Sequence, residues 1–511
     1  MIDRTSGRTF YLLFIATVAW VLFAVLFWRP LIWPDFNAQI MNDGDTPLYV
    51  SYAVNLATCP FSVSHGVMTN AIGLNCQLPI LGQVMNHYLD HPPGMVWLLS
   101  IFAAQSDQPI AAARVIECAL SAGMLILCAL VAARALSTAA AVGVLLSSAL
   151  VPLFWFHAVA INLNQAALFF SVLTVGALME HQRSRSAGWL VLSLAAFAWG
   201  GLTDWPTFFI AGPIFLWLVY LRQWRAALAF LIVGVATLGG ILVWFDGLVN
   251  NTGYPFKVLQ FFKEVFVDQH DFRNAPHLMP IHQALMTSFV VMGSVMSVGL
   301  VLLLFPVVAV FNPKLRARYA PLGLFFACFL TQGVLNQVLF HQWAATHNYW
   351  TYYYLPVIFM SGGLLLDALW LWGGGRHRWV FWVLLSLVVV CCLRFAYQKN
   401  KGWRATYATP PVSQLDYLKA NKLDGMLAPG AVLLARDQEP FFGQGAKLRL
   451  VFGQPLRPIA LAASVGCDNV YTVYKNASLS AADRAAMPKG TVLELYEWYV
   501  IPRNYLNPAC N

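Results

Sequence analysis

Long apolar runs constrain this chain more than any other feature of its sequence. Runs of about 20 apolar residues, the length that an α-helix needs to cross the hydrocarbon core of a bilayer, recur between residues 10 and 396. Of the 511 residues, 59% are hydrophobic and 10% are charged, which is far from the composition of a soluble globular protein. The pattern therefore predicts an all-α polytopic membrane protein.

Two domains are predicted. Residues 1–396 form the membrane domain, with about eleven transmembrane helices, and residues 397–511 form a small extracytoplasmic α/β domain with strands at 431–435 and 469–474 and a helix at 415–421. Arg4 and Arg8 precede the first apolar run, and no small-residue cleavage site follows it, so this run is predicted to be a retained signal anchor. The spans are predicted near residues 10–28, 109–134, 137–157, 162–180, 188–203, 206–221, 226–246, 284–306, 319–340, 350–372 and 378–396.

Positive charge lies in the short loops between these runs. The chain has 31 Lys and Arg against 22 Asp and Glu, a formal net charge of +9, but the cations do not cluster on one soluble face, so a nucleic-acid partner is not expected. With a cytoplasmic N-terminus every predicted inside loop is basic, which predicts loops 29–108 and 247–283 and the C-terminal domain on the outer side, most simply of a bacterial inner membrane. The basic residues of the inside loops are Arg134, Arg183, Arg185, Arg222, Arg225, Lys314, Arg316, Arg318, Arg376 and Arg378.

The first outer loop begins with groups suited to acid–base chemistry. Asp43, Gly44 and Asp45 follow the first span closely, and Tyr49 lies four residues after Asp45. A carboxylate at the mouth of a membrane cavity can deprotonate an incoming hydroxyl. Asp-Gly is also a common turn pair, and taken alone the two carboxylates read more readily as a solvated turn. A divalent metal held by Asp43 and Asp45 is a further open alternative.

The same loop ends at Tyr88, Asp90 and His91, followed by Pro92-Pro93. A cationic side chain at this position can hold a leaving phosphate. A segment near 92–104 is too polar to span a bilayer and is predicted to lie in the interface.

Together, the two ends of this loop resemble the C-type (GT-C) membrane glycosyltransferases, the superfamily of the lipid A aminoarabinose transferases and the protein O-mannosyltransferases. In these enzymes an acidic residue four positions before a Tyr follows the first span, and a Tyr-x-x-Lys/His-Pro-Pro segment closes the loop. Asp45 with Tyr49, and Tyr88 with His91 and its two prolines, match both motifs in order and approximate separation. The resemblance covers roughly the first half of the chain, and it includes Ala113-Arg114, Thr203-Asp204-Trp205-Pro206 and, later, His347-Asn348-Tyr349-Trp350.

The resemblance implies the GT-C helical fold and an inverting transfer of sugar from a polyprenyl-phosphate lipid to a glycan, lipid or protein hydroxyl on the outer face. It implies that Asp45 is the general base and that His91 approaches the donor phosphate. Relatives differ from this chain at Gly94, where they carry Leu, and at Asn164-Gln165, where an acidic residue is common. The remaining candidates are Tyr88, Asp90, Arg114, Lys257, Lys263, Arg273 and His347 for the donor and Asp43 and Tyr49 for the acceptor side.

Structural interpretations compete with several of these assignments. Arg114 is equally suited to a salt bridge with Glu117 one turn away. Lys257, Lys263 and Arg273 suit a solvated loop as well as a phosphate clamp. The tyrosines at 352–354 are predicted to belong to an interfacial aromatic belt. Asp204 is predicted at a hairpin tip and Asp367 near the cytoplasmic end of a span, with no catalytic role for either.

The alternative function is that of a lipid or sugar transporter or flippase. Many spans and basic inside loops fit a transporter as well as an enzyme. Transport requires ionisable groups along a pathway through the membrane, whereas nearly all ionisable residues of this chain lie at loop level. The first outer loop therefore favours the enzyme.

Four of the nine cysteines lie in regions predicted to be outside, Cys59 and Cys76 in the first loop and Cys467 and Cys510 in the tail. An even number in an oxidising compartment predicts the disulfides Cys59–Cys76 and Cys467–Cys510, against the alternative of four unpaired thiols. Mass spectrometry of unreduced peptides should recover both linked pairs. Free thiols at all four positions would contradict the pairing and weaken the predicted orientation.

Overall fold

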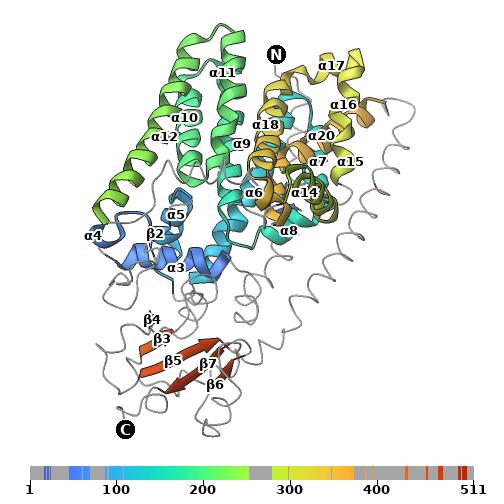
Figure 1. Ribbon diagram of the computed structural model, residues 1–511. Coiled ribbons are helices and arrows are strands. Elements are labelled where there is room, and N and C mark those ends of the chain that lie inside the picture. Colours follow the sequence, from blue (N-terminus) through green and yellow to red (C-terminus); the bar gives the residue numbers. More distant parts are fainter. Residues whose placement is uncertain are drawn as a thin grey trace.

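The fold is that of a computed structural model of the chain (Figure 1). The structure describes residues 17–18, 20–21, 24, 45–59, 61–69, 87–88, 91–106, 109–252, 279–296, 299–346, 348–372, 386, 394, 432–435, 456–458, 470–475, 493–495 and 498–502.

A helical bundle accounts for most of the described residues. Within the described part of the chain, five helices are long and apolar enough to cross a membrane, and five shorter apolar helices have 10–17 residues. The helices are α3 (Asp45–Thr58), α4 (Phe61–Ser64), α5 (Gly94–Phe102), α6 (Pro109–Ala135), α7 (Thr138–Ser147), α8 (Pro152–His157), α9 (Leu163–Ser184), α10 (Ala187–Thr203), α11 (Ala211–Tyr220), α12 (Trp224–Thr252), α14 (Ile281–Met296), α15 (Gly299–Leu302), α16 (Leu304–Phe311), α17 (Pro313–Tyr319), α18 (Gly323–Leu339), α19 (His341–Thr346) and α20 (Leu355–Trp372). Short 3₁₀ turns join them at η1 (Ser148–Leu150), η2 (Trp205–Ile210), η4 (Ala320–Leu322) and η5 (Asn348–Tyr354).

Most predicted spans coincide with helices, and two are interrupted. The span predicted at 137–157 breaks at Val151, whose backbone is extended, because Pro152 disfavours a helical conformation in the residue before it. The span predicted at 284–306 is interrupted at Leu303, between α15 and α16. The predicted spans at 10–28 and 378–396 lie almost wholly outside the described residues, so the count of eleven stays a prediction.

Helices α7 and α20 pack closely because small residues line their contact. A Cβ added to Gly143 would lie 2.6 Å from the Gly362 carbonyl oxygen, and one added to Gly363 would lie 2.8 Å from the Ala140 carbonyl oxygen. Small residues let helix backbones approach in a membrane, where van der Waals packing and not water exclusion drives association. Larger residues at these positions would separate the two helices.

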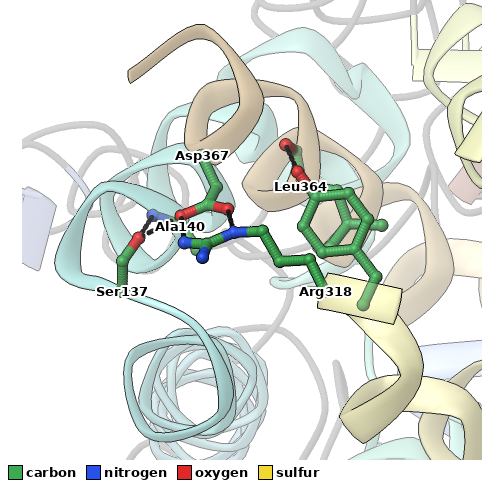
Figure 2. A network of polar contacts seen from close by, with 6 residues as sticks. Ser137, Ala140, Arg318, Leu364 and Asp367 are labelled. Carbon is green, nitrogen blue, oxygen red and sulfur yellow. Dashed lines mark hydrogen bonds and ion pairs between the residues drawn. The ribbon is translucent and has the colours of Figure 1, made fainter. Parts of the chain in front are cut away.

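A polar network locks the same two helices to α17 (Figure 2). The Asp367 carboxylate of α20 is fully buried and accepts hydrogen bonds from Arg318 Nε at 2.6 Å and from Arg318 Nη2 at 2.9 Å. It also accepts one from the hydroxyl of Ser137. Ser137 in turn caps α7 by accepting from the Ala140 amide at 3.2 Å. Asp367 therefore lies near the end of its span, as predicted, and serves as the junction of three helices.

A five-stranded mixed sheet forms the described part of the C-terminal region. Its order is β4-β3-β5-β7-β6, from β3 (Val432–Ala435), β4 (Leu456–Pro458), β5 (Val470–Lys475), β6 (Leu493–Leu495) and β7 (Trp498–Pro502). The two predicted strands correspond to β3 and β5, which pair in parallel, as do β3 and β4. Parallel neighbours need long crossovers, usually helices. Those connections, including the helix predicted at 415–421, lie outside the described residues, so the α/β assignment stays a prediction.

Cysteine bonding is described for four residues. Cys59, which follows α3, is disulfide-bonded. Cys118, Cys128 and Cys328 are buried free thiols. The partner of Cys59 therefore lies outside the described residues, and its pairing with Cys76 stays a prediction.

Replacing Arg318 with Met should destabilise the bundle, because it leaves the Asp367 carboxylate buried without its cation. We expect a loss of about 3 kcal/mol, the lower end for removing one partner of a buried ion pair, since the Arg318 side chain is 34% exposed. Thermal unfolding in detergent measures the effect. Arg316→Met, on the exposed side of the same helix, is the control and should leave the melting temperature unchanged. Equal melting temperatures for the two variants would contradict a structural role for the pair.

Candidate functional site

A buried carboxylate at the turn after α10 is the centre of the candidate site. Asp204 ends α10 and caps η2, and its Oδ1 accepts a hydrogen bond from the Trp205 amide at 2.9 Å. Only 1% of its surface is exposed. Burial of a carboxylate is costly unless several donors satisfy it. Several hydrogen-bond donors are therefore expected around Asp204.

His91 is the first partner that comes from another part of the chain. Its Nδ1 lies 2.8 Å from Asp204 Oδ1, across 113 residues of sequence. Because an ionised carboxylate only accepts hydrogen bonds, we assign the proton of this contact to Nδ1. The other ring nitrogen, Nε2, lies on the opposite edge of the imidazole. Pro92 disfavours a helical backbone at His91 and holds it just before α5. Part of the ring reaches the surface, since the His91 side chain is 20% exposed.

Tyr353 is the second distant partner. Its hydroxyl donates to Asp204 Oδ2 at 2.7 Å, and the Tyr353 side chain on η5 is fully buried. Both carboxylate oxygens are therefore occupied, and the segment before α5, the α10–η2 turn and η5 converge on one residue.

This convergence corrects two predictions. Asp204 does lie at a turn, but it is buried and engaged by His91. Tyr352, Tyr353 and Tyr354 are buried and do not form an interfacial belt. The available signal was the Asp in Thr203-Asp204-Trp205-Pro206, between two apolar runs, since an ionisable residue at membrane depth is by default a functional candidate.

Close packing brings His91 to Asp204. A Cβ on Gly94, the first residue of α5, would lie 2.7 Å from the Leu202 carbonyl oxygen and 2.9 Å from Thr203 Oγ1 at the end of α10. Only glycine permits this approach without displacing the end of α10. The Trp97 indole fixes the same helix by donating to the Gly66 carbonyl at 2.7 Å.

Asp45 is the first residue of α3, which packs against α5. Thr46 anchors the start of the helix, because its buried hydroxyl accepts a hydrogen bond from the Ile161 amide at 2.9 Å. One turn later Tyr49 is buried in a cluster with Met95 and other residues of α5. Asp45 lies four residues before Tyr49, and His91 lies four residues before Met95. Both candidates therefore precede the same buried cluster between α3 and α5.

Helix α6 carries two buried charged residues near the start of α3. Arg114 and Glu117 are 2% and 0% exposed. Glu117 Oε1 accepts a hydrogen bond from the Asn162 amide at 3.0 Å, and the Asn162 side chain accepts one from the Asn164 amide. The asparagine found where relatives carry an acid thus lies in the first turn of α9, which Asn162 caps.

The other predicted residues divide into placed and undescribed ones. The backbone of Tyr88 lies in the short strand β2 (His87–Tyr88), which pairs with β1 (Met68–Thr69). Among the described residues no three His, Cys, Asp or Glu side chains group as metal ligands. The residues that lie outside the description are Asp43, Asp90, Lys257, Lys263, Arg273 and His347.

Gly94→Ala should impair the fold where His91 meets Asp204. The added methyl collides with backbone atoms of α10, and overpacking of this kind costs about 1–3 kcal/mol. We expect a lower melting temperature together with a lower sugar-transfer rate. Gly212→Ala in α11, where a Cβ meets nothing within 4 Å, is the control and should preserve both. A Gly94→Ala protein as stable and active as wild type would contradict the close approach.

One protein family matches part of this chain. Residues 90–245, from just before His91 into α12, match the family described as dolichyl-phosphate-mannose-protein mannosyltransferase. No curated protein sequence gives a significant match.

Solved structures share the fold over nearly the whole chain. The crystal structure of apo ArnT from Cupriavidus metallidurans is 14% identical, with a TM-score of 0.60 over 95% of this chain and 97% of that one. The same protein bound to undecaprenyl phosphate gives 0.58 at 13% identity, with the same coverage. The apo oligosaccharyltransferase from Archaeoglobus fulgidus gives 0.51 at 14% identity, over 91% of this chain and 69% of that one. The predicted resemblance to the GT-C glycosyltransferases is therefore confirmed, by the family match over residues 90–245 and by the shared fold.

Proposed function

We propose that this protein transfers a sugar from a polyprenyl-phosphate donor to an acceptor hydroxyl, with inversion at the anomeric carbon. The observation that carries the proposal is the partly exposed His91, held by the buried Asp204 beside the helix that packs against α3. A structural neighbour, ArnT from Cupriavidus metallidurans, binds undecaprenyl phosphate, which supports a donor of this class.

Each step of the reaction is assigned to a group of this chain. His91 contacts the phosphate of the donor, whose lipid tail lies between spans. Asp45 accepts the proton of the acceptor hydroxyl as its oxygen bonds to the anomeric carbon. The bond from that carbon to the phosphate oxygen breaks on the opposite face, and polyprenyl phosphate departs with the electron pair. One displacement inverts the centre, and the phosphate needs no general acid.

The other candidates take supporting positions in this proposal. Tyr49 holds α3 against α5 and so positions Asp45 for the acceptor, which is a glycan, a lipid or a protein. Asp43 lies on the same acceptor side. The groups proposed near the donor are Tyr88, Asp90, Arg114, Lys257, Lys263, Arg273 and His347.

We place the reaction on the outer face of the membrane. In Figure 1, α3, α5 and the C-terminal sheet lie toward one end of the bundle, whereas α17 and the turn from α11 to α12 lie toward the other. The second end carries Arg222, Arg316 and Arg318, and basic loops stay cytoplasmic. This arrangement supports a common outer side for Asp45 and the tail.

Asp45→Asn should abolish sugar transfer and spare donor binding, because it removes the base at nearly constant volume. We expect the kcat to fall by at least about 100-fold, the lower end for general base catalysis. Product formation with a verified polyprenyl-phosphate sugar measures it, and Asp246→Asn, an exposed Asp on α12, is the control. Wild-type turnover in Asp45→Asn would refute the assignment and make Asp43 or Asp90 the next candidate.

His91→Ala should weaken donor binding more than turnover. Loss of a charge-assisted hydrogen bond to phosphate raises the donor KM by about 10-fold. His282→Ala, an exposed histidine on α14, is the matched control and should leave the donor KM unchanged. If this protein moved its substrate across a bilayer and formed no covalent product, the transporter function would be favoured instead.

A further inference from the structure

We infer that Asp204 is a positioning residue, which orients and charges His91 for the donor phosphate. The inference rests on the proposed function and assigns to Asp204 a task that the first-loop motifs do not contain. Asp204 does not touch the donor itself. It acts through the imidazole ring, and Tyr353 acts through Asp204.

The hydrogen bonds of Asp204 fix its orientation. Oδ1 accepts from the Trp205 amide at 2.9 Å and contacts His91 Nδ1 at 2.8 Å, while Oδ2 accepts from the Tyr353 hydroxyl at 2.7 Å. The Trp205 amide is part of the backbone and the Tyr353 ring is fully buried, so neither can follow a rotating carboxylate. The plane of the carboxylate is therefore set by the fold, and it sets the direction of the imidazole.

The contact with Asp204 determines which edge of His91 meets a ligand. Because Nδ1–H is directed at the carboxylate, a donor phosphate is met through Nε2. A side chain that is already oriented loses less conformational freedom when the ligand binds. This ordering strengthens donor binding without any added contact.

The same contact favours a positively charged ring. Of the three groups that bond Asp204, only His91 can carry a positive charge, and a buried carboxylate is stabilised by an adjacent cation. Nε2 is then a donor as well, which suits a phosphate oxygen. A neutral amide at position 204 would keep the volume of the side chain but would not favour the imidazolium.

A matched pair of substitutions tests the inference. Asp204→Asn should raise the donor KM by about 10-fold, the lower end for groups that orient a ligand-binding histidine, and change kcat much less. Tyr353→Phe should shift the donor KM in the same direction by a smaller factor. Asp367→Asn, which removes an equally buried carboxylate from the Arg318 network, is the control and should lower the melting temperature without raising the donor KM.

A double variant separates positioning from a general structural effect. If Asp204 acts through His91, adding Asp204→Asn to His91→Ala should raise the donor KM no further. Multiplying effects, or a wild-type donor KM in Asp204→Asn and Tyr353→Phe, would overturn the inference while leaving the proposed function intact. A wild-type protein that forms no product with polyprenyl-phosphate sugars would overturn the proposed function, and this inference with it.

Discussion

The arrangement of the candidate site depends on the buried carboxylate of Asp204. It accepts hydrogen bonds from groups on three segments that are far apart in sequence, and it caps η2. An unpaired charge at this depth would be expensive, so the carboxylate is stable only while its donors remain in place. Because the buried charge needs these donors, His91 and η5 keep a fixed position relative to the end of α10.

A second buried carboxylate offers an informative contrast. Asp367 binds Arg318, whose planar guanidinium is always charged and bonds both carboxylate oxygens. This geometry suits a permanent joint between helices. Asp204 binds instead a histidine, whose charge depends on protonation and whose second nitrogen lies on the other edge of the ring. The same acidic group therefore serves stability at one site and, in our proposal, ligand recognition at the other.

The loop from α3 to α5 shows how such a site is held at the bundle end. Thr46 bonds the chain before α9, Trp97 bonds the Gly66 carbonyl, and Gly94 lets α5 lie directly on α10. These contacts join the loop to α5, α9 and α10 through backbone groups. Helices α3 and α5 are thereby fixed relative to each other, which the proposed displacement requires, because the base and the phosphate contact must face opposite sides of one carbon.

The sequence by itself determined the membrane class, most of the helices and the glycosyltransferase resemblance. Apolar runs of bilayer length have few alternatives to a helix, because backbone polar groups in lipid must bond within the segment. Motif order in the first loop predicted Asp45 and His91 as candidates because both motifs are local patterns. The breaks at Val151 and at Leu303 were missed, since an apolar run continues through each of them.

Only the tertiary structure decided the partners of those residues. Asp204 read as a hairpin tip and Tyr353 as an interfacial aromatic, because their local patterns suit those roles equally well. The contact between His91 and Asp204 spans 113 residues, and that between Asp204 and Tyr353 spans 149. The first contact arises from the packing of α5 on α10, and the second from the burial of Tyr353 on η5. Hydropathy predicts neither contact, since it indicates how deeply a residue lies in the membrane and not which neighbour it contacts there.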